Sequence, residues 1–273
     1  MFGRFVCLLG VLIVLGSVDR AAAKDPPPSL SNIHVIGVTS SLGTQAEIKT
    51  IGITAFGNKL TYLPIVDWGL DDLAVREIEG ALGARFTVKS TPIDPSLLAR
   101  VHSSLFKSQA KSLEEAMHAA PPNDVDAYLV LLPDEQFLPY PSNQSIFGAG
   151  AYRQNWGQGH HTGEGIVYLA YSLYLIDAKT GRTMMGQTAG PIFEEKRSFS
   201  DELLVMPHSL LCPHFYTNDA DWPETAEQLS DGQKQTLRYD LASLIIGSLP
   251  QILGKMKLAD DMSSKADANA ESK

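Results

Sequence analysis

Short runs of apolar and β-branched residues divide the first half of the chain into strand-like segments. These runs predict strands over 33–38, 48–56, 62–66, 86–88 and 127–132. Pro64 restricts the third run to a sheet edge or a bulge, because proline has no amide hydrogen to donate to a ladder. The last run is apolar throughout and ends at Pro133, a pattern typical of a strand buried on both faces.

Between these strands, apolar residues recur at helical spacing. One helix is predicted over 71–82, where an acidic pair starts the segment and Gly83 closes it. A second is predicted from Pro95 to Phe106, with a short extension at 112–115. Strands and helices that alternate on this scale indicate an α/β protein.

A closing helix has the strongest apolar stripe in the chain. The stripe consists of Leu237, Leu241, Leu244, Ile245 and Leu249. Pro223 and the segment Thr225-Ala226-Glu227-Gln228 form a helix-start signature ahead of it. Pro250 is expected to kink or stop this helix.

The clearest strand runs from Ile166 to Ile176. Its alternate apolar residues line one face: Val167, Leu169, Tyr171, Leu173 and Leu175. The segment 177–181 then predicts a turn in which Gly181 suits a positive φ, and 182–188 returns as the partner strand. We therefore predict a single α/β sandwich with a mixed sheet, a long C-terminal strand hairpin and a closing helix.

The segment 133–164 differs in composition from the segments on either side of it, because it is rich in Pro, Gly, Asn, Gln and aromatic residues. A loop of this length inside a compact domain is uncommon. Its aromatic residues Phe147, Tyr152 and Trp156 could form an adaptable contact surface. A loop that folds back over a sheet edge and protects it explains the composition equally well.

The N-terminus has the pattern of a secretory signal peptide. Arg4 precedes an uncharged apolar run from Phe5 to Val18, and Ala21-Ala22-Ala23 supplies the small residues of a cleavage site. The alternative is an uncleaved anchor, although the run is shorter than a bilayer span requires. The mature chain is expected to begin at Lys24 and to be periplasmic or secreted, with no transmembrane span after cleavage.

Composition and charge exclude further classes of protein. With 273 residues, 44% of them hydrophobic, the chain can bury a sizeable core, which excludes global disorder. A formal charge of −9 argues against a chain-wide nucleic-acid footprint. We expect the following organisation: signal peptide 1–23, linker 24–32, α/β domain 33–258 with a Gly/aromatic-rich loop at 133–164, and disordered tail 259–273.

One group of residues could hold a metal ion. His208, Cys212 and His214 lie close together in the sequence, and imidazole and thiolate both bind zinc. The alternative is an irregular segment with a buried free cysteine and two ordinary histidines. The adjacent pair His160-His161 could also touch a metal, but neighbouring side chains in a loop need not converge.

Other chemistry-bearing motifs are incomplete. Gly148-x-Gly150 neither follows a strand directly nor opens a helix, so it is no dinucleotide fingerprint. Phe56-Gly57-Asn58-Lys59 is superficially similar to the nucleophile block of secreted lipid esterases, but Lys59 stands where the serine would be. The carboxylates Asp67, Asp71 and Asp72 near Trp68 fit helix capping and dipole complementation better than acid/base chemistry.

The order of the predicted elements resembles that of a known family. Asp126-Ala127-Tyr128-Leu129 precedes the hairpin, whose turn reads Asp177-x-x-Thr180-Gly181. In this respect the chain resembles the α/β sandwich of bacterial envelope assembly proteins: penicillin-binding-protein activator lipoproteins, the curli-secretion channel lipoprotein and the N-terminal domain of the Tol translocation protein. The segments 36–43 and 67–72 also resemble uncharacterised secreted bacterial proteins. The only cysteine near the N-terminus, Cys7, lies inside the apolar run, so the lipid-acceptor cysteine of the lipoprotein members is missing.

Two functions follow from these observations. The first is a non-enzymatic binding or assembly module of the bacterial cell envelope, whose partner is another envelope protein or polymer and not a nucleic acid. The second is a metal-assisted periplasmic hydrolase that uses His208, Cys212 and His214. The first is preferred, because no complete nucleophile, cofactor or metal-ligand set can be assigned.

Overall fold

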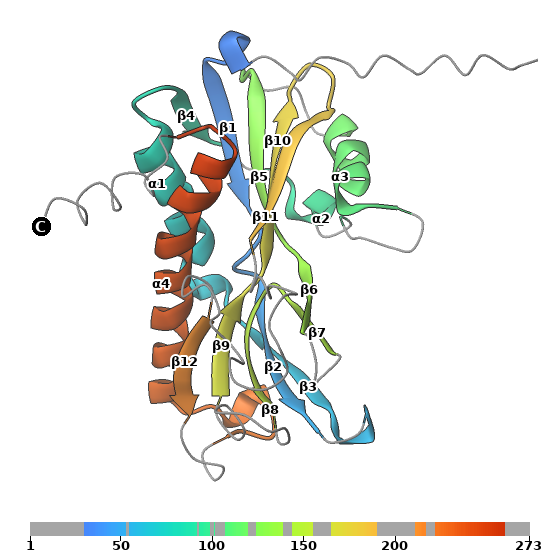
Figure 1. The fold of residues 1–273 in the computed structure, drawn as a ribbon, viewed down its shortest axis with the longest axis vertical. Helices are drawn as coiled ribbons and strands as arrows, with labels where there is room; N and C mark the ends of the chain where they lie inside the picture. The colour runs from blue at the N-terminus through green and yellow to red at the C-terminus, as the bar shows by residue number, and fades with distance from the viewer. Residues whose placement is uncertain are drawn as a thin grey trace, which may run out of the picture.

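The strands form two five-stranded mixed sheets that follow one another along the long axis of the molecule (Figure 1). A computed structural model describes residues 30–52, 55–91, 93–98, 101, 107–119, 124–138, 144–154, 165–189, 211–216 and 222–259. The strands of the first sheet are β1 (Val35–Ser40), β4 (Thr87–Ser90), β5 (Ala127–Pro133), β10 (Tyr171–Asp177) and β11 (Thr183–Ala189). Those of the second are β2 (Gln45–Ile51), β3 (Lys59–Pro64), β8 (Ala149–Gln154), β9 (Gly165–Leu169) and β12 (Leu211–Tyr216).

The first sheet has the order β11-β10-β5-β1-β4, and the second has the order β12-β9-β8-β2-β3. The first sheet contains two parallel pairings, β1 with β5 and β1 with β4, and the second contains one, β2 with β8. The α/β class is therefore confirmed, as are the hairpin and the closing helix. The strands are divided between two mixed sheets, however, where the sequence had indicated one.

The long strand predicted over 166–176 shows how the chain passes from one sheet to the other. It is interrupted at Ala170, whose backbone N–H donates to Gly148 O at 2.8 Å and whose carbonyl accepts from Asp134 N at 3.1 Å. The residues before this break pair in the second sheet and those after it in the first. The predicted alternation is nevertheless confirmed, since the five odd-numbered apolar residues from Val167 to Leu175 all lie in the main core.

Four helices cover the two sides of the first sheet. Their bounds are α1 (Leu70–Leu82), α2 (Pro95–Leu98), α3 (Gln109–His118) and α4 (Asp231–Lys255). Helices α1 and α4 pack on one face over the main core, and α2 and α3 pack on the other face over a second apolar cluster (Figure 1). Helix α4 is long enough to extend along both sheets.

The closing helix differs from its prediction at both ends. The predicted start at Thr225 forms a capping box with Gln228, but it caps only a short 3-10 turn, η5 (Ala226–Gln228). A second capping box, between Ser230 and Gln233, begins α4. The helix then continues through Pro250 to Lys255. The carbonyl that Pro250 cannot bond belongs to Ile246, which lies on the exposed side of the helix, so solvent can satisfy it.

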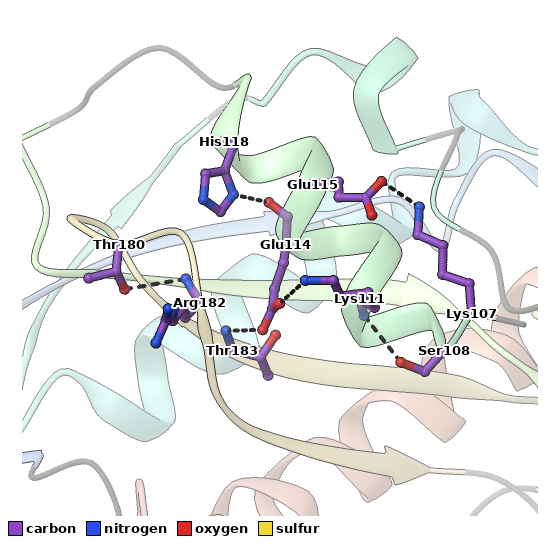
Figure 2. Close-up of polar contacts among 9 residues, drawn as sticks. All are labelled: Lys107, Ser108, Lys111, Glu114, Glu115, His118, Thr180, Arg182 and Thr183. Carbon is purple, nitrogen blue, oxygen red and sulfur yellow. Dashed lines mark hydrogen bonds and ion pairs between the residues drawn. The ribbon is translucent and has the colours of Figure 1, made fainter. Parts of the chain in front are cut away.

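The β10–β11 turn is built around one carboxylate. Asp177 Oδ1 accepts from Lys179 N at 3.0 Å and from Thr180 N at 2.7 Å, and Gly181 has a φ of +66° as predicted. Figure 2 shows that α3 packs beside this turn, where Glu114 Oε1 accepts from Thr183 N at 2.9 Å. The turn is therefore held both locally and by a helix.

Replacing Gly181 by valine should lower the free energy of unfolding by about 1–3 kcal/mol, because a β-branched residue is strained at a positive φ. A Cβ atom at this position would also lie 3.0 Å from the His118 ring. Urea unfolding of the variant measures the loss. Equal stability of variant and parent would show that the turn conformation is wrong.

Candidate functional site

The residues proposed for a metal site fall largely outside the described structure. His208 lies outside it, as do His160 and His161. Cys212 and His214 are two residues apart in strand β12. Among the described residues, no group of three or more metal-ligating side chains comes together. Zinc binding therefore stays a prediction.

The acidic cluster near Trp68 has a structural role. Asp71 and Asp72 lie in the first turn of α1, where they complement the helix dipole, but no side chain caps this helix. Instead, Asp71 Oδ1 accepts from Ser40 Oγ at 2.5 Å, Leu42 N at 2.8 Å and Gly43 N at 3.1 Å. Asp71 thus fixes the connection through which the chain passes from β1 to β2.

The predicted loop 133–164 contains regular structure. It includes β8 and a two-stranded hairpin made of β6 (Glu135–Leu138) and β7 (Gln144–Phe147). Tyr152 is buried and Phe147 is partly exposed, whereas Trp156 lies outside the described residues. The segment was mistaken for a loop because glycine and small residues hide the alternation of its strands. The part that folds back lies over a face of the second sheet, whereas the protective interpretation placed it over a sheet edge.

The β6–β7 hairpin covers the outer face of the second sheet, opposite α4. Two rows of side chains lie on this face, as the strand register shows. One row runs through Tyr62, Glu47, Gly150 and Tyr168, and the next runs through Leu60, Lys49, Tyr152 and Ile166. With Ile51 and Ile146, the buried members of these rows form a third apolar cluster. Two charged residues are buried beside it.

Glu47 and Lys49 bind the backbone of strand β7. Glu47 Oε2 accepts from Phe147 N at 3.2 Å, and the Lys49 ammonium donates to the Ser145 carbonyl. One acidic and one basic side chain thereby satisfy a donor and an acceptor of β7, which lies over the sheet without joining its ladder. Both charged groups have polar partners, as buried ions require.

Tyr168 completes this arrangement from the far side of Gly150. Its hydroxyl donates to Glu47 Oε2 at 2.7 Å. Burial, followed by the charge of Glu47, raises the pKa of Tyr168 well above its ordinary value. Partial burial and the same carboxylate also raise the pKa of Tyr62 on strand β3. Both tyrosines therefore remain neutral hydroxyl donors at physiological pH.

The outward side of strand β3 is apolar. Leu60 and Tyr62 lie opposite Lys49 and Glu47 and are exposed by 42% and 47%, and Pro64 is also exposed. Val66, in the turn η3 (Val66–Trp68) that follows, is exposed by 69%. We call Leu60, Tyr62, Pro64 and Val66 the β3 apolar row. An edge strand normally carries polar or charged residues on its solvent side, so this composition is unusual.

The hairpin tip next to the β3 apolar row holds an exposed aromatic side chain. Phe56, in the turn η2 (Ala55–Gly57), is as exposed as it would be in an isolated residue, at 102%. Gly52 N donates to Asn58 Oδ1 at 3.0 Å. A Cβ atom on Gly52 would approach the Gly57 backbone to 2.7 Å, so the two sides of the tip are in close contact. The fold thus fixes the base from which Phe56 projects.

The inward side of β3 is firmly attached. Leu63 and Ile65 are buried in the main core, and Ala226 N of η5 donates to Thr61 Oγ1 at 3.0 Å. Because the strand is anchored on one side, its apolar residues on the other are presented in a fixed geometry. This arrangement suits binding of a complementary apolar surface, and it contains no nucleophile or acid/base pair among the described residues. This binding face was not predicted from the sequence. The pattern that could have indicated it is a strand that contains proline and has apolar residues on both faces.

No family model matches the chain, and no curated protein matches it. Among solved structures, it is similar to protein XCC0632 from Xanthomonas campestris, described under the family model DUF330, with 11% identity over 82% of this chain and 87% of that chain and a TM-score of 0.35. It is also similar to the lipoprotein GNA1162 from Neisseria meningitidis, with 11% identity over 61% of this chain and 88% of that chain and a TM-score of 0.24. Both likenesses are too loose to show a shared fold.

Within the described ranges, no helix combines the length and apolarity needed to cross a membrane. The fold and the site together define a mixed α/β protein with a candidate binding face on the edge of its second sheet.

Proposed function

We propose that this chain is an exported, non-enzymatic docking module of the bacterial cell envelope that binds another envelope protein through the β3 apolar row. The segment 1–23 directs export, and the α/β domain over 33–258 carries the binding face. The observation that carries the proposal is the run of exposed apolar side chains on an edge strand whose inner side is anchored in the core.

The composition of the row favours a protein partner. None of its four residues is charged, and Lys59 at the start of the strand pairs with Glu224 at 3.7 Å. A surface without free charge offers little to nucleic acid, whose binding depends on neutralising phosphates. It is suited instead to an apolar protein surface, for which tyrosine is a favoured contact residue.

Exposure of the row is costly unless a partner covers it. Removing apolar surface from water is favourable by about 25 cal/mol per Å². Covering two or three large side chains therefore stabilises a complex by several kcal/mol. Contiguous apolar patches on soluble proteins commonly mark interaction sites. Phe56 and Phe147 extend the surface that a partner could cover.

We expect Tyr62→Ser to weaken binding of the envelope partner by about 2 kcal/mol, close to thirtyfold, because truncating an aromatic contact removes a major part of an interface energy. The partner is first found by placing a photoreactive phenylalanine analogue at position 62 and irradiating living cells. Its affinity for parent and variant is then measured with both proteins purified.

Tyr239 provides a matched control, because it is exposed by 73% but lies on α4, away from β3. The analogue at position 239 should give no cross-link to the same protein, and Tyr239→Ser should leave its affinity unchanged. Equal cross-linking from both positions, or unchanged affinity of Tyr62→Ser, would contradict the proposal. Thermal melts confirm that both variants are folded.

A further inference from the structure

A second surface feature is lined by residues of α1 and α4, the two helices on one face of the first sheet (Figure 1), and by Trp68, two residues after the end of the β3 apolar row. Two adjoining hollows open there, with volumes of about 320 and 270 Å³. Trp68 and Arg238 line both of them. Taken together, the two adjoining hollows reach the volume of a site for a small ligand.

The two helices bring one stripe of residues each to these hollows. Gly69, Asp72 and Arg76 recur at helical spacing at the start of α1, and Lys234 and Arg238 do so on α4. At the far ends of the helices, Arg85 Nη1 donates to Lys257 O at 2.9 Å. The two helices are therefore joined just beyond their C-terminal ends, and the hollows lie beside their N-terminal turns.

Two guanidinium groups face solvent at this place without a partner of opposite charge. Within the described part of the chain, no carboxylate lies at ion-pair distance from Arg76 or Arg238, whereas Lys234 pairs with Asp231 at 4.0 Å. Arginine is the side chain that best matches a carboxylate or phosphate in planar, two-pronged geometry. On a chain with a formal charge of −9, two arginines that line the same hollow form a local concentration of positive charge.

Trp68 forms a fixed wall between the hollows. It is half-buried and packs against the main core, and its backbone N–H donates to Ile65 O at 2.9 Å. Gly69 follows with a φ of +69°, which turns the chain directly from η3 into α1. The indole is thus held in place while part of it remains accessible to a ligand.

We propose that these hollows bind an acidic saccharide chain. A carboxylate of the ligand pairs with Arg76 and Arg238, and a sugar ring lies against Trp68. The remaining lining groups, Asp72, Asp231 and Gln235, offer oxygen atoms that accept hydrogen bonds from sugar hydroxyls. A phosphate headgroup with acyl chains supplies few such donors.

The test uses calorimetry of the full chain with a tetramer of galacturonic acid, compared with its methyl ester, which has the same rings without the charges. The free acid should bind, and the ester should bind about tenfold or more weakly, since loss of a charged hydrogen-bonded pair costs at least 1.4 kcal/mol. Trp68→Ala and Arg238→Gln should each weaken binding of the acid by a similar factor.

Arg182→Gln serves as the control, because Arg182 is an exposed arginine beside the β10–β11 turn. It should leave binding unchanged. Absence of binding, equal binding of acid and ester, or equal effects of Arg238→Gln and Arg182→Gln would overturn the inference. Binding of phosphatidylglycerol vesicles that depends on Trp68 and Arg238, without binding of the tetramer, would assign the surface to lipid and overturn it as well. Failure of this test leaves the docking function of β3 untouched, since the two surfaces share no residue.

Discussion

Replacing Gly150 by alanine should destabilise the protein by about 3 kcal/mol or more, through overpacking and the loss of a buried hydrogen bond. Gly150 lies between Glu47 and Tyr168 in the row across β2, β8 and β9. A Cβ atom there would lie 2.4 Å from Glu47 O and 2.7 Å from the Tyr168 hydroxyl oxygen. The first of these is a backbone atom, so relief requires the strands to move apart.

The effect cannot come from strand propensity, because alanine is more favourable than glycine in regular structure. What glycine provides is room for the Tyr168 ring to cross β8 and reach the Glu47 carboxylate. Chemical denaturation of variant and parent measures the difference in the free energy of unfolding.

Gly80→Ala is the matched control. Gly80 lies in α1, and a Cβ atom at this position would meet nothing within 4 Å. The same substitution should therefore stabilise the protein by about 0.5–1 kcal/mol. Similar stability changes at positions 80 and 150 would show that Tyr168 does not pack over Gly150 as described.

Raising the pH from 8 to 11 should cost the fold about 4 kcal/mol through three buried tyrosines. Burial raises the pKa values of Tyr152, Tyr168 and Tyr171 above the ordinary value of about 10. In the unfolded chain these groups lose their protons above pH 10, whereas in the folded protein they keep them. The stability they contribute is therefore fully present below pH 10 and is lost as the pH rises above it, at about 1.4 kcal/mol for each tyrosine at pH 11.

Urea unfolding at the two pH values measures this loss, and Tyr152→Phe tests its origin. Phenylalanine keeps the ring and removes the proton, so the variant should lose about 1.4 kcal/mol less than the parent between pH 8 and pH 11. Tyr239→Phe, at an exposed position, should lose the same amount as the parent. If both variants behave like the parent, the buried tyrosines are not the cause.

Local patterns predicted several elements closely. The alternation over 166–176 identified which residues enter the main core, and the turn at 177–181 has the glycine conformation expected of it. The unbroken apolar run 127–132 became the strand β5, buried along almost its whole length. Each of these features depends on neighbours within a few residues, which is the range over which periodicity and turn chemistry act.

Features that depend on distant neighbours were not predicted. Ala170 interrupts the strand because Gly148 and Asp134 bond its backbone from elsewhere in the chain. The segment 144–154 was interpreted as a loop. Its small residues leave space for Tyr168 and Glu47, which are distant in the sequence, so the local pattern does not show why they are there. Pro250 was expected to kink or stop α4, and of these alternatives the stop is wrong: the helix continues to Lys255, because the affected carbonyl faces solvent.

The sequence by itself determined the α/β class, the hairpin turn and the residues that face the core, because these follow from local spacing and backbone preference. Pro64 correctly indicated that β3 lies at a sheet edge, but the tertiary structure alone decided which of its apolar residues remain uncovered and which arginines lie at one hollow. Whether Leu60 and Tyr62 are core or surface depends on what the next strand or helix covers, and that is set by pairing between segments far apart in the chain. For the same reason, Trp68, Arg76 and Arg238 form one surface only after α1 and α4 have packed together.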